Sequence, residues 1–180
     1  LLPGLLDSLR NNLARQNMDT ALFELGRTFS PGPQESRKVA MLLTGRRQSA
    51  FWQDADAKLD ISDLKGVVEE LLESLGVFGV QFARRETPTT LMLESAEIQM
   101  GKQVIGQLGQ LQPALGKRYE AREAVYLAEL DLDVLLQLRL GRLLAERAHD
   151  GAASRRAARS GARRGRARDA RRRTRARWSR

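Results

Sequence analysis

The sequence predicts an α+β domain, built on a mainly antiparallel sheet flanked by helices and followed by an Arg-rich tail. Two short apolar segments on either side of Gly101 and Lys102 indicate a β-hairpin. Residues 61–75 carry apolar side chains at helical spacing, and residues 124–134 alternate apolar with polar side chains. The predicted order is helix, two strands, helix, two strands, hairpin, helix, strand.

The hairpin makes a specific prediction about register. If Met100 lies opposite Gln103, then Ile98 lies opposite Ile105, and this pair sits on the buried face of the sheet. Pro113 cannot donate a ladder hydrogen bond but suits the first turn of a helix, which we expect to end near residue 119.

The best helix is predicted over residues 61–75, with Asp60 or Ser62 as its cap and Gly76 as its left-handed end. Leu71 lies in the middle of its apolar stripe, so we expect that side chain to be fully buried. We expect further strands at residues 21–26, 39–43, 80–84, 91–93 and 96–100. In the first of these strands, Phe23 and Leu25 share one face.

An amphipathic helix is predicted at the start of the chain, over residues 1–18. Its leucines fall on one stripe: Leu2, Leu5, Leu6, Leu9 and Leu13. An ordinary core-facing helix is the simpler interpretation of this stripe. A helix that faces a partner is the alternative.

Composition limits the classes of protein. A length of 180 residues is enough for one domain with a core. The absence of Cys excludes disulfides, and together with a single His it nearly excludes a Cys or His zinc site. No apolar run reaches 18 residues, so we expect no membrane span and a cytoplasmic protein. Because residue 1 is Leu, we expect a fragment of a longer chain. We divide it into a core domain at 1–136, a degenerate transition at 137–150 and an Arg/Ala-rich tail at 151–180.

The tail accounts for the basic net charge of +9, because it holds 13 of the 31 basic residues and one of the 22 acidic residues. It has no aliphatic side chain larger than Ala, so we expect it to be disordered, or a fraying helix in places. Arg, Ala, Gly and Ser have GC-rich codons, and we interpret the run as a gene read out of frame. The alternative is a small RNA-binding protein that uses an Arg-rich tail to contact phosphates.

No catalytic, cofactor-binding or metal-binding residue is predicted from the motifs. Gly101, Gly106 and Gly109 lack the Lys and Ser or Thr of a phosphate loop, so we interpret them as turn and strand glycines. The remaining candidates are three carboxylates on one predicted strand face: Glu129, Asp131 and Asp133. Such a row could hold magnesium, but a solvated strand face is favoured.

Five segments in a fixed order carry a family resemblance across residues 1–136. They read LLPGLLDSLRNNLAR, ALFELGRTF, DISDLKGVVEELLESLG, IGQLGQLQP and VYLAELDLDVLL. With these segments the chain resembles the beta subunits of bacterial phenylalanine–tRNA ligases. Gln112 stands where that family commonly has His.

The resemblance implies a module shaped like a class II aminoacyl-tRNA synthetase domain but without its active-site signatures. It implies an alpha subunit as partner in an α2β2 heterotetramer, and tRNA as a second partner. It also implies ATP and magnesium for the whole enzyme, with neither expected on this fragment. The implied role is structural support and subunit assembly. We expect Leu2, Leu5 and Leu9 to lie at a subunit interface and to be partly exposed in the isolated chain.

Overall fold

A computed structural model describes residues 1–29, 35–47, 57–145 and 147 of the chain. The chain divides into two units, Leu1–Arg139 and Leu140–Arg180. The elements of the first unit are α1 (Leu2–Ala14), β1 (Thr20–Phe29), β2 (Glu35–Thr44), α2 (Ile61–Ser74), β3 (Gln81–Arg84), β4 (Met92–Met100), β5 (Gln103–Leu111), α3 (Pro113–Arg118) and β6 (Val125–Asp131). Residues 132–145 are also helical. The predicted α+β class is confirmed, whereas the predicted tail lies outside the described residues.

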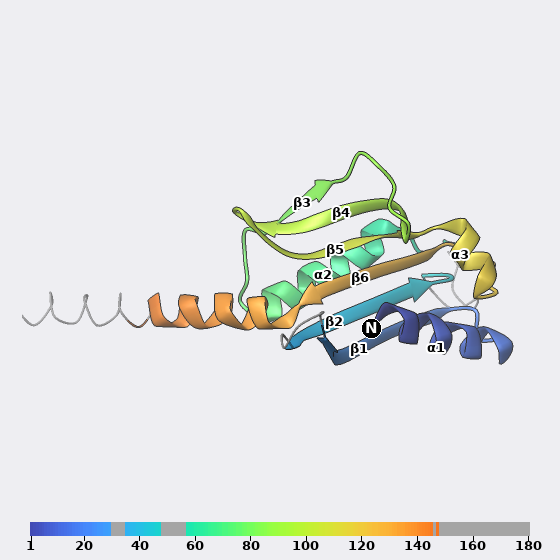
Figure 1. Cartoon of the computed structure of the whole chain (residues 1–180), viewed down its shortest axis with the longest axis horizontal. Coiled ribbons are helices and arrows are strands. Elements are labelled where there is room, and N and C mark those ends of the chain that lie inside the picture. Colours follow the sequence, from blue (N-terminus) through green and yellow to red (C-terminus); the bar gives the residue numbers. More distant parts are fainter. Residues whose placement is uncertain (30–34, 48–56, 146, 148–180) are drawn as a thin grey trace, which may run out of the picture. The chain divides into compact units, whose positions relative to one another are not determined.

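The six strands form one sheet in the order β1-β2-β6-β5-β4-β3, and every neighbouring pair is antiparallel (Figure 1). Strand β6, which comes last in the chain, therefore lies in the middle of the sheet, between β2 and β5. Strands β1 and β3 are the two edges.

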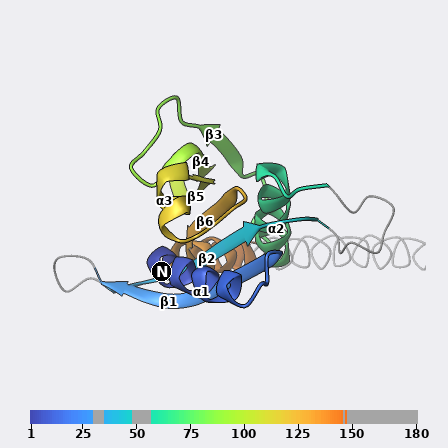
Figure 2. The same ribbon diagram turned by 90° about the vertical axis from the view of Figure 1, so that its right-hand side faces the viewer.

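Helix α2 covers one face of the sheet, and α1 and α3 cover the other (Figure 2). The core on the α2 face contains Leu64, Val68, Leu72, Val39, Met41, Leu43, Ile98, Ile105, Leu108, Ala128, Leu130 and Leu135. The core on the α1 face contains Leu2, Leu5, Leu6, Leu9, Ala40, Leu42, Met92, Leu111, Val125 and Leu127. Two separate apolar layers thus hold the sheet, one on each side.

The predicted ends of α2 are confirmed. The Asp60 carboxylate accepts hydrogen bonds from the backbone N–H groups of Ser62 at 2.7 Å and Asp63 at 3.1 Å. The Asp63 carboxylate in turn accepts the backbone N–H of Asp60 at 2.7 Å, which completes a capping box. Gly76 follows the helix with φ of 71°, where a residue without Cβ avoids strain.

The prediction that Leu71 is fully buried was wrong. Leu71 is half-buried, and its neighbour Val67 is 42% exposed, whereas Leu72 is only 2% exposed. The buried stripe of α2 is therefore narrower than its apolar stripe, because α2 does not cover the edge strand β1. The flank with Val67 and Leu71 borders an open groove instead.

The hairpin is confirmed, but its predicted register is wrong after the first pair. Met100 lies opposite Gln103, as expected, whereas Ile98 lies opposite Gly106 and not Ile105. A register shift between Ile98 and Gln99 inserts one residue into β5. The predicted strands 91–93 and 96–100 are parts of one strand, β4, that contains a second register shift.

Strand β6 ends earlier than the alternating pattern predicts. The Asp131 carboxylate accepts the backbone N–H of Val134 at 3.1 Å, as a helix-capping side chain does. The chain turns there from strand to helix, so Leu132 and Val134 are helical instead of extended. Residues 137–145 are helical too, where the sequence predicted no element. In the second unit, Leu140, Leu143 and Leu144 are exposed.

The burial pattern of α2 gives a direct stability prediction. We expect Leu72→Ala to lower the free energy of unfolding by roughly 2–5 kcal/mol, because it empties a fully packed site. Leu71→Ala, at a half-buried position of the same helix, should cost less than half as much. Urea unfolding followed by circular dichroism measures both values. Equal losses would mean that the two neighbours are equally buried in solution.

Candidate functional site

The three predicted interface leucines are buried within the chain itself. Leu2 is 6% exposed, Leu5 is 4% exposed and Leu9 is 0% exposed. The expectation that they are partly exposed is therefore wrong. Their partners are apolar side chains of β2 and β6, including Leu42 and Leu127. Burial within one chain does not test whether α1 lies near a subunit interface. The location of Leu2, Leu5 and Leu9 at such an interface therefore stays a prediction.

An apolar opening lies elsewhere, on the α2 face beside β1. It is a groove of about 470 Å³ between β1, β2 and α2. Its lining comprises Ala21, Leu22, Phe23, Leu25, Val39, Met41, Leu43, Val67, Glu70, Leu71 and Ser74. Glu70 is the one charged residue in this lining. The groove is therefore suited to an apolar occupant.

Strand register explains why the groove is apolar. Phe23 lies opposite Met41, and Leu25 lies opposite Val39, so these four side chains share the α2 face. Phe23 is nevertheless 73% exposed and Leu25 is 60% exposed, since α2 lies over the inner strands. Phe29, at the end of β1, is 78% exposed. Exposed apolar side chains of this kind, beside an apolar groove on a folded chain, are typical of an interaction surface.

The sequence contained a signal for this groove. The strand predicted at residues 21–26 has Leu22 on one face and Phe23 with Leu25 on the other. Apolar side chains on both faces are typical of a strand covered on both sides. The leucine stripe of α1 predicts a partner surface on that helix instead.

The opposite face of the sheet carries a polar cluster, which we define as Lys38, Arg85, Glu97, Gln107 and Glu129. The Lys38 ammonium lies 3.3 Å from the Glu129 carboxylate, and the Arg85 guanidinium lies 2.7 Å from Glu97. Four of the five residues, all except Glu97, line a cavity of about 220 Å³. A hydrogen bond from the Gln99 amide and the bond from Arg85 lower the pKa of Glu97. Glu97 is therefore held ionised beside the Arg85 guanidinium, which does not suit it to general acid catalysis.

The residues present do not fit a magnesium ion. The row of carboxylates predicted on one strand is divided between separate partners: Glu129 pairs with Lys38, and Asp133 pairs with Arg37. Asp131 caps the following helix. Among the described residues, no group of three or more His, Cys, Asp or Glu side chains is arranged to hold a metal ion.

The three glycines are turn and strand glycines, as predicted. Gly101 has φ of 61° in the turn between β4 and β5. Gly106 and Gly109 lie in β5, where neighbouring backbone leaves no room for a side chain. A Cβ on Gly106 would lie 2.6 Å from the carbonyl oxygen of Glu129. Their spacing reflects sheet packing and not phosphate binding.

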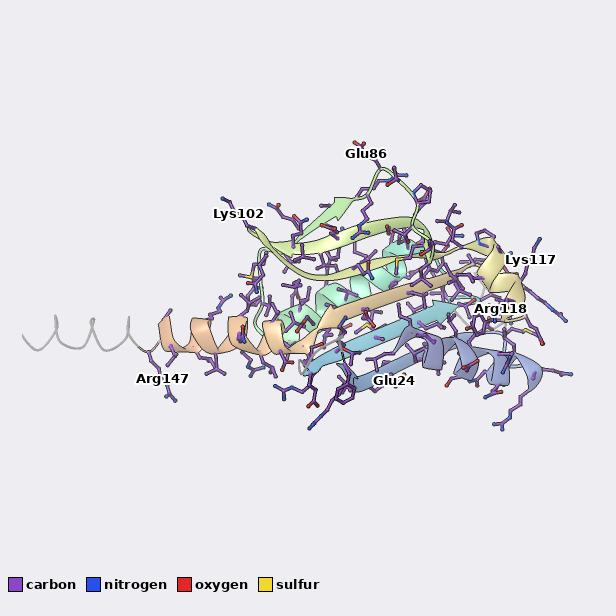
Figure 3. The ribbon with its side chains drawn as sticks, viewed as in Figure 1. Glu24, Glu86, Lys102, Lys117, Arg118 and Arg147 are labelled. Atoms are coloured by element: carbon purple, nitrogen blue, oxygen red, sulfur yellow. The ribbon has the colours of Figure 1, made fainter. Side chains whose placement is uncertain are left out.

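Three further exposed cations lie at a turn and at a helix end. Lys102 lies at the β4–β5 turn, and Lys117 and Arg118 extend outward from α3 (Figure 3). Cations in the last turn of a helix are favoured by its backbone carbonyls. No helix of the described residues is long and apolar enough to span a membrane.

Comparisons with known proteins match most of the chain. The sequence profile described as "Phenylalanyl tRNA synthetase beta chain CLM domain" matches residues 1–132. The phenylalanine–tRNA ligase beta subunit of Bacillus subtilis is 37% identical over 142 residues, which are 76% of this chain and 18% of that protein. That of Bacillus licheniformis is 38% identical over 144 residues, 77% of this chain and 18% of that protein. The chain thus spans less than a fifth of the length of these relatives.

Solved structures give the same fold at lower identity. The crystal structure of pyrrolysyl-tRNA synthetase from Desulfitobacterium hafniense superimposes with a TM-score of 0.60 at 16% sequence identity. The match covers 77% of this chain and 48% of that chain. At this identity the likeness shows the fold alone.

The ion pair between Asp133 and Arg37 gives a prediction about pH. The backbone N–H and guanidinium of Arg37 lower the pKa of Asp133 from its ordinary 3.8. The interaction of Asp133 with Arg37 therefore stabilises the folded chain above pH 3.8. This stabilisation is lost as the pH falls through the lower pKa that Asp133 has in the folded state. We expect Asp133→Asn to be less stable at pH 7 and to lose less stability on acidification. Urea unfolding at several pH values measures this, and identical slopes for both proteins would contradict it.

The glycines of the sheet give a second prediction. Gly109→Ala drives a Cβ against the backbone carbonyl oxygen of Glu94 and places it 2.8 Å from Met92 Sδ and 2.9 Å from Ser95 Cβ. We therefore expect a loss of roughly 1–3 kcal/mol in unfolding free energy. Gly66→Ala is the matched control, because a Cβ at this position of α2 meets nothing within 4 Å. It should stabilise the chain by about 0.5–1 kcal/mol through its better helix propensity. Thermal unfolding of the two variants should therefore shift in opposite directions.

Proposed function

Because the chain belongs to the phenylalanyl-tRNA synthetase beta chain family, in the CLM domain, we propose that it is a structural and subunit-assembly module of a phenylalanine–tRNA ligase. In this role it supports the attachment of phenylalanine to tRNA without contributing catalytic residues. ATP and magnesium serve the whole enzyme in the cytoplasm, and this chain binds neither.

The observation that carries the proposal is the apolar groove beside β1. A folded chain whose own core is closed on both faces still exposes Phe23 at 73% and Leu25 at 60% next to this groove. Such a surface is stabilised when a partner removes it from water. We propose the alpha subunit of the ligase as this partner, within an α2β2 heterotetramer that also binds tRNA.

The α1 leucines have a structural role in this proposal. Leu2, Leu5 and Leu9 are packed against β2 and β6, so they hold α1 in place and offer little surface to a partner. They hold α1 in place, and we keep this helix as part of the proposed assembly region. The contacts themselves are assigned to the groove.

Substitution in the groove tests this proposal. We expect Phe23→Ser to weaken binding of the purified alpha subunit at least about tenfold, since it removes an aromatic anchor that binding would bury. Its stability should change little because the ring is mostly exposed in the free chain. Val104→Ser is the control, an apolar residue of β5 that is 50% exposed and lies outside the groove. Sedimentation velocity measures the affinities, and equal binding by Phe23→Ser and the unchanged chain would reject the groove as the assembly surface.

A further inference from the structure

The backbone of the edge strand β1 can be oriented from one hydrogen bond. The backbone N–H of Arg37, in β2, donates to the carboxylate of Asp133 at 2.8 Å. Asp133 follows β6, so it lies on the side of β2 that faces away from β1. In an antiparallel strand, the N–H and C=O of one residue point to the same side. Arg37 therefore turns both groups away from β1.

The register carries this orientation into β1. Arg37 lies opposite Arg27, so the two form a pair without mutual backbone hydrogen bonds, and Arg27 points its N–H and C=O to the open edge. Every second residue of a strand points its backbone groups to the same side, so Phe23 and Leu25 also point their N–H and C=O groups to the open edge. In the described residues β2 is the only strand that pairs with β1. The backbone groups of these residues thus form an unpaired ladder along the edge.

The residues that offer this ladder also line the groove. Phe23 and Leu25 present unpaired backbone groups at the edge and apolar side chains toward α2. A strand added beside them would place every second side chain over the groove, at the same spacing. A helix laid in the groove would fill the apolar volume but leave the ladder unpaired. An extended segment satisfies both features together.

We propose that the occupant of the groove is an extended segment of the alpha subunit, which adds as a seventh strand along the outer edge of β1. This inference rests on the proposed function, because it names how the partner binds at the same groove. With Glu70 as the single charged residue of the lining, the added strand presents aliphatic or aromatic side chains at alternate positions. Its other face lies toward the α1 side of the sheet.

A proline at Arg27 tests strand addition without changing the groove. Arg27 does not line the groove, and its N–H points to the open edge, where proline is tolerated in a strand. Arg27→Pro removes that donor and places its ring in the path of an added strand. We expect alpha-subunit binding to weaken roughly 10- to 100-fold, as for the loss of one or two net hydrogen bonds. Thermal unfolding of the free chain should be nearly unchanged.

Arg27→Ala is the matched control. It removes the same side chain and its ion pair with Glu35, at 2.8 Å, but keeps the backbone N–H. Exposed ion pairs contribute little, so this variant should bind like the unchanged chain. If Arg27→Pro also binds normally while Phe23→Ser does not, the groove is the assembly surface but strand addition is wrong. If neither affects binding, both proposals are wrong.

Amide hydrogen exchange of the unchanged chain gives a test that needs no variant. In the free chain, the amides of Phe23, Leu25 and Arg27 should exchange fast, while those of Leu22 and Glu24 are protected by β2. Adding the alpha subunit should slow the first set at least about tenfold, in an alternating pattern. If adding the alpha subunit protects all amides of β1 equally, or protects none, the inference is wrong. This test remains valid if Arg27→Pro does not fold.

Discussion

The structure depends on burying β6 on both of its faces. This strand lies in the middle of the sheet, with Ala128 and Leu130 packed toward α2 and Val125 and Leu127 packed toward α1. A strand with two apolar faces requires two covering layers, and neither α1 nor α2 can supply both. The helices before and after the first hairpin are therefore committed to opposite sides of the sheet.

This constraint decides which apolar side chains are left for a partner. Leu5 and Leu9 of α1 are used against β2 and β6, and Leu72 of α2 is used on the other face. Neither helix extends over the α2 face of the outer strand β1. Phe23 and Leu25 of β1 therefore remain exposed, and a search for amphipathic helices does not find them.

Sequence patterns predicted the elements well where the physical signal is local. The capping carboxylate of Asp60, the left-handed Gly76 and the pair Met100–Gln103 all depend on residues close in sequence. The misses depend on contacts distant in sequence. Residue spacing could not predict the bulge after Ile98 or the burial of Leu2, because the partner strands decide both.

Four charged side chains on the α1 face of the sheet are paired within the chain. On the α1 face, Lys38 and Glu129 neutralise each other, as do Arg85 and Glu97. Each of these four charged groups therefore already has its partner inside the chain. The outward backbone groups of β1, in contrast, have no strand to pair with among the described residues, and the apolar side chains beside them stay exposed. Backbone ladders and apolar grooves recognise polypeptide, and a sheet with this edge is therefore organised to be extended by another strand.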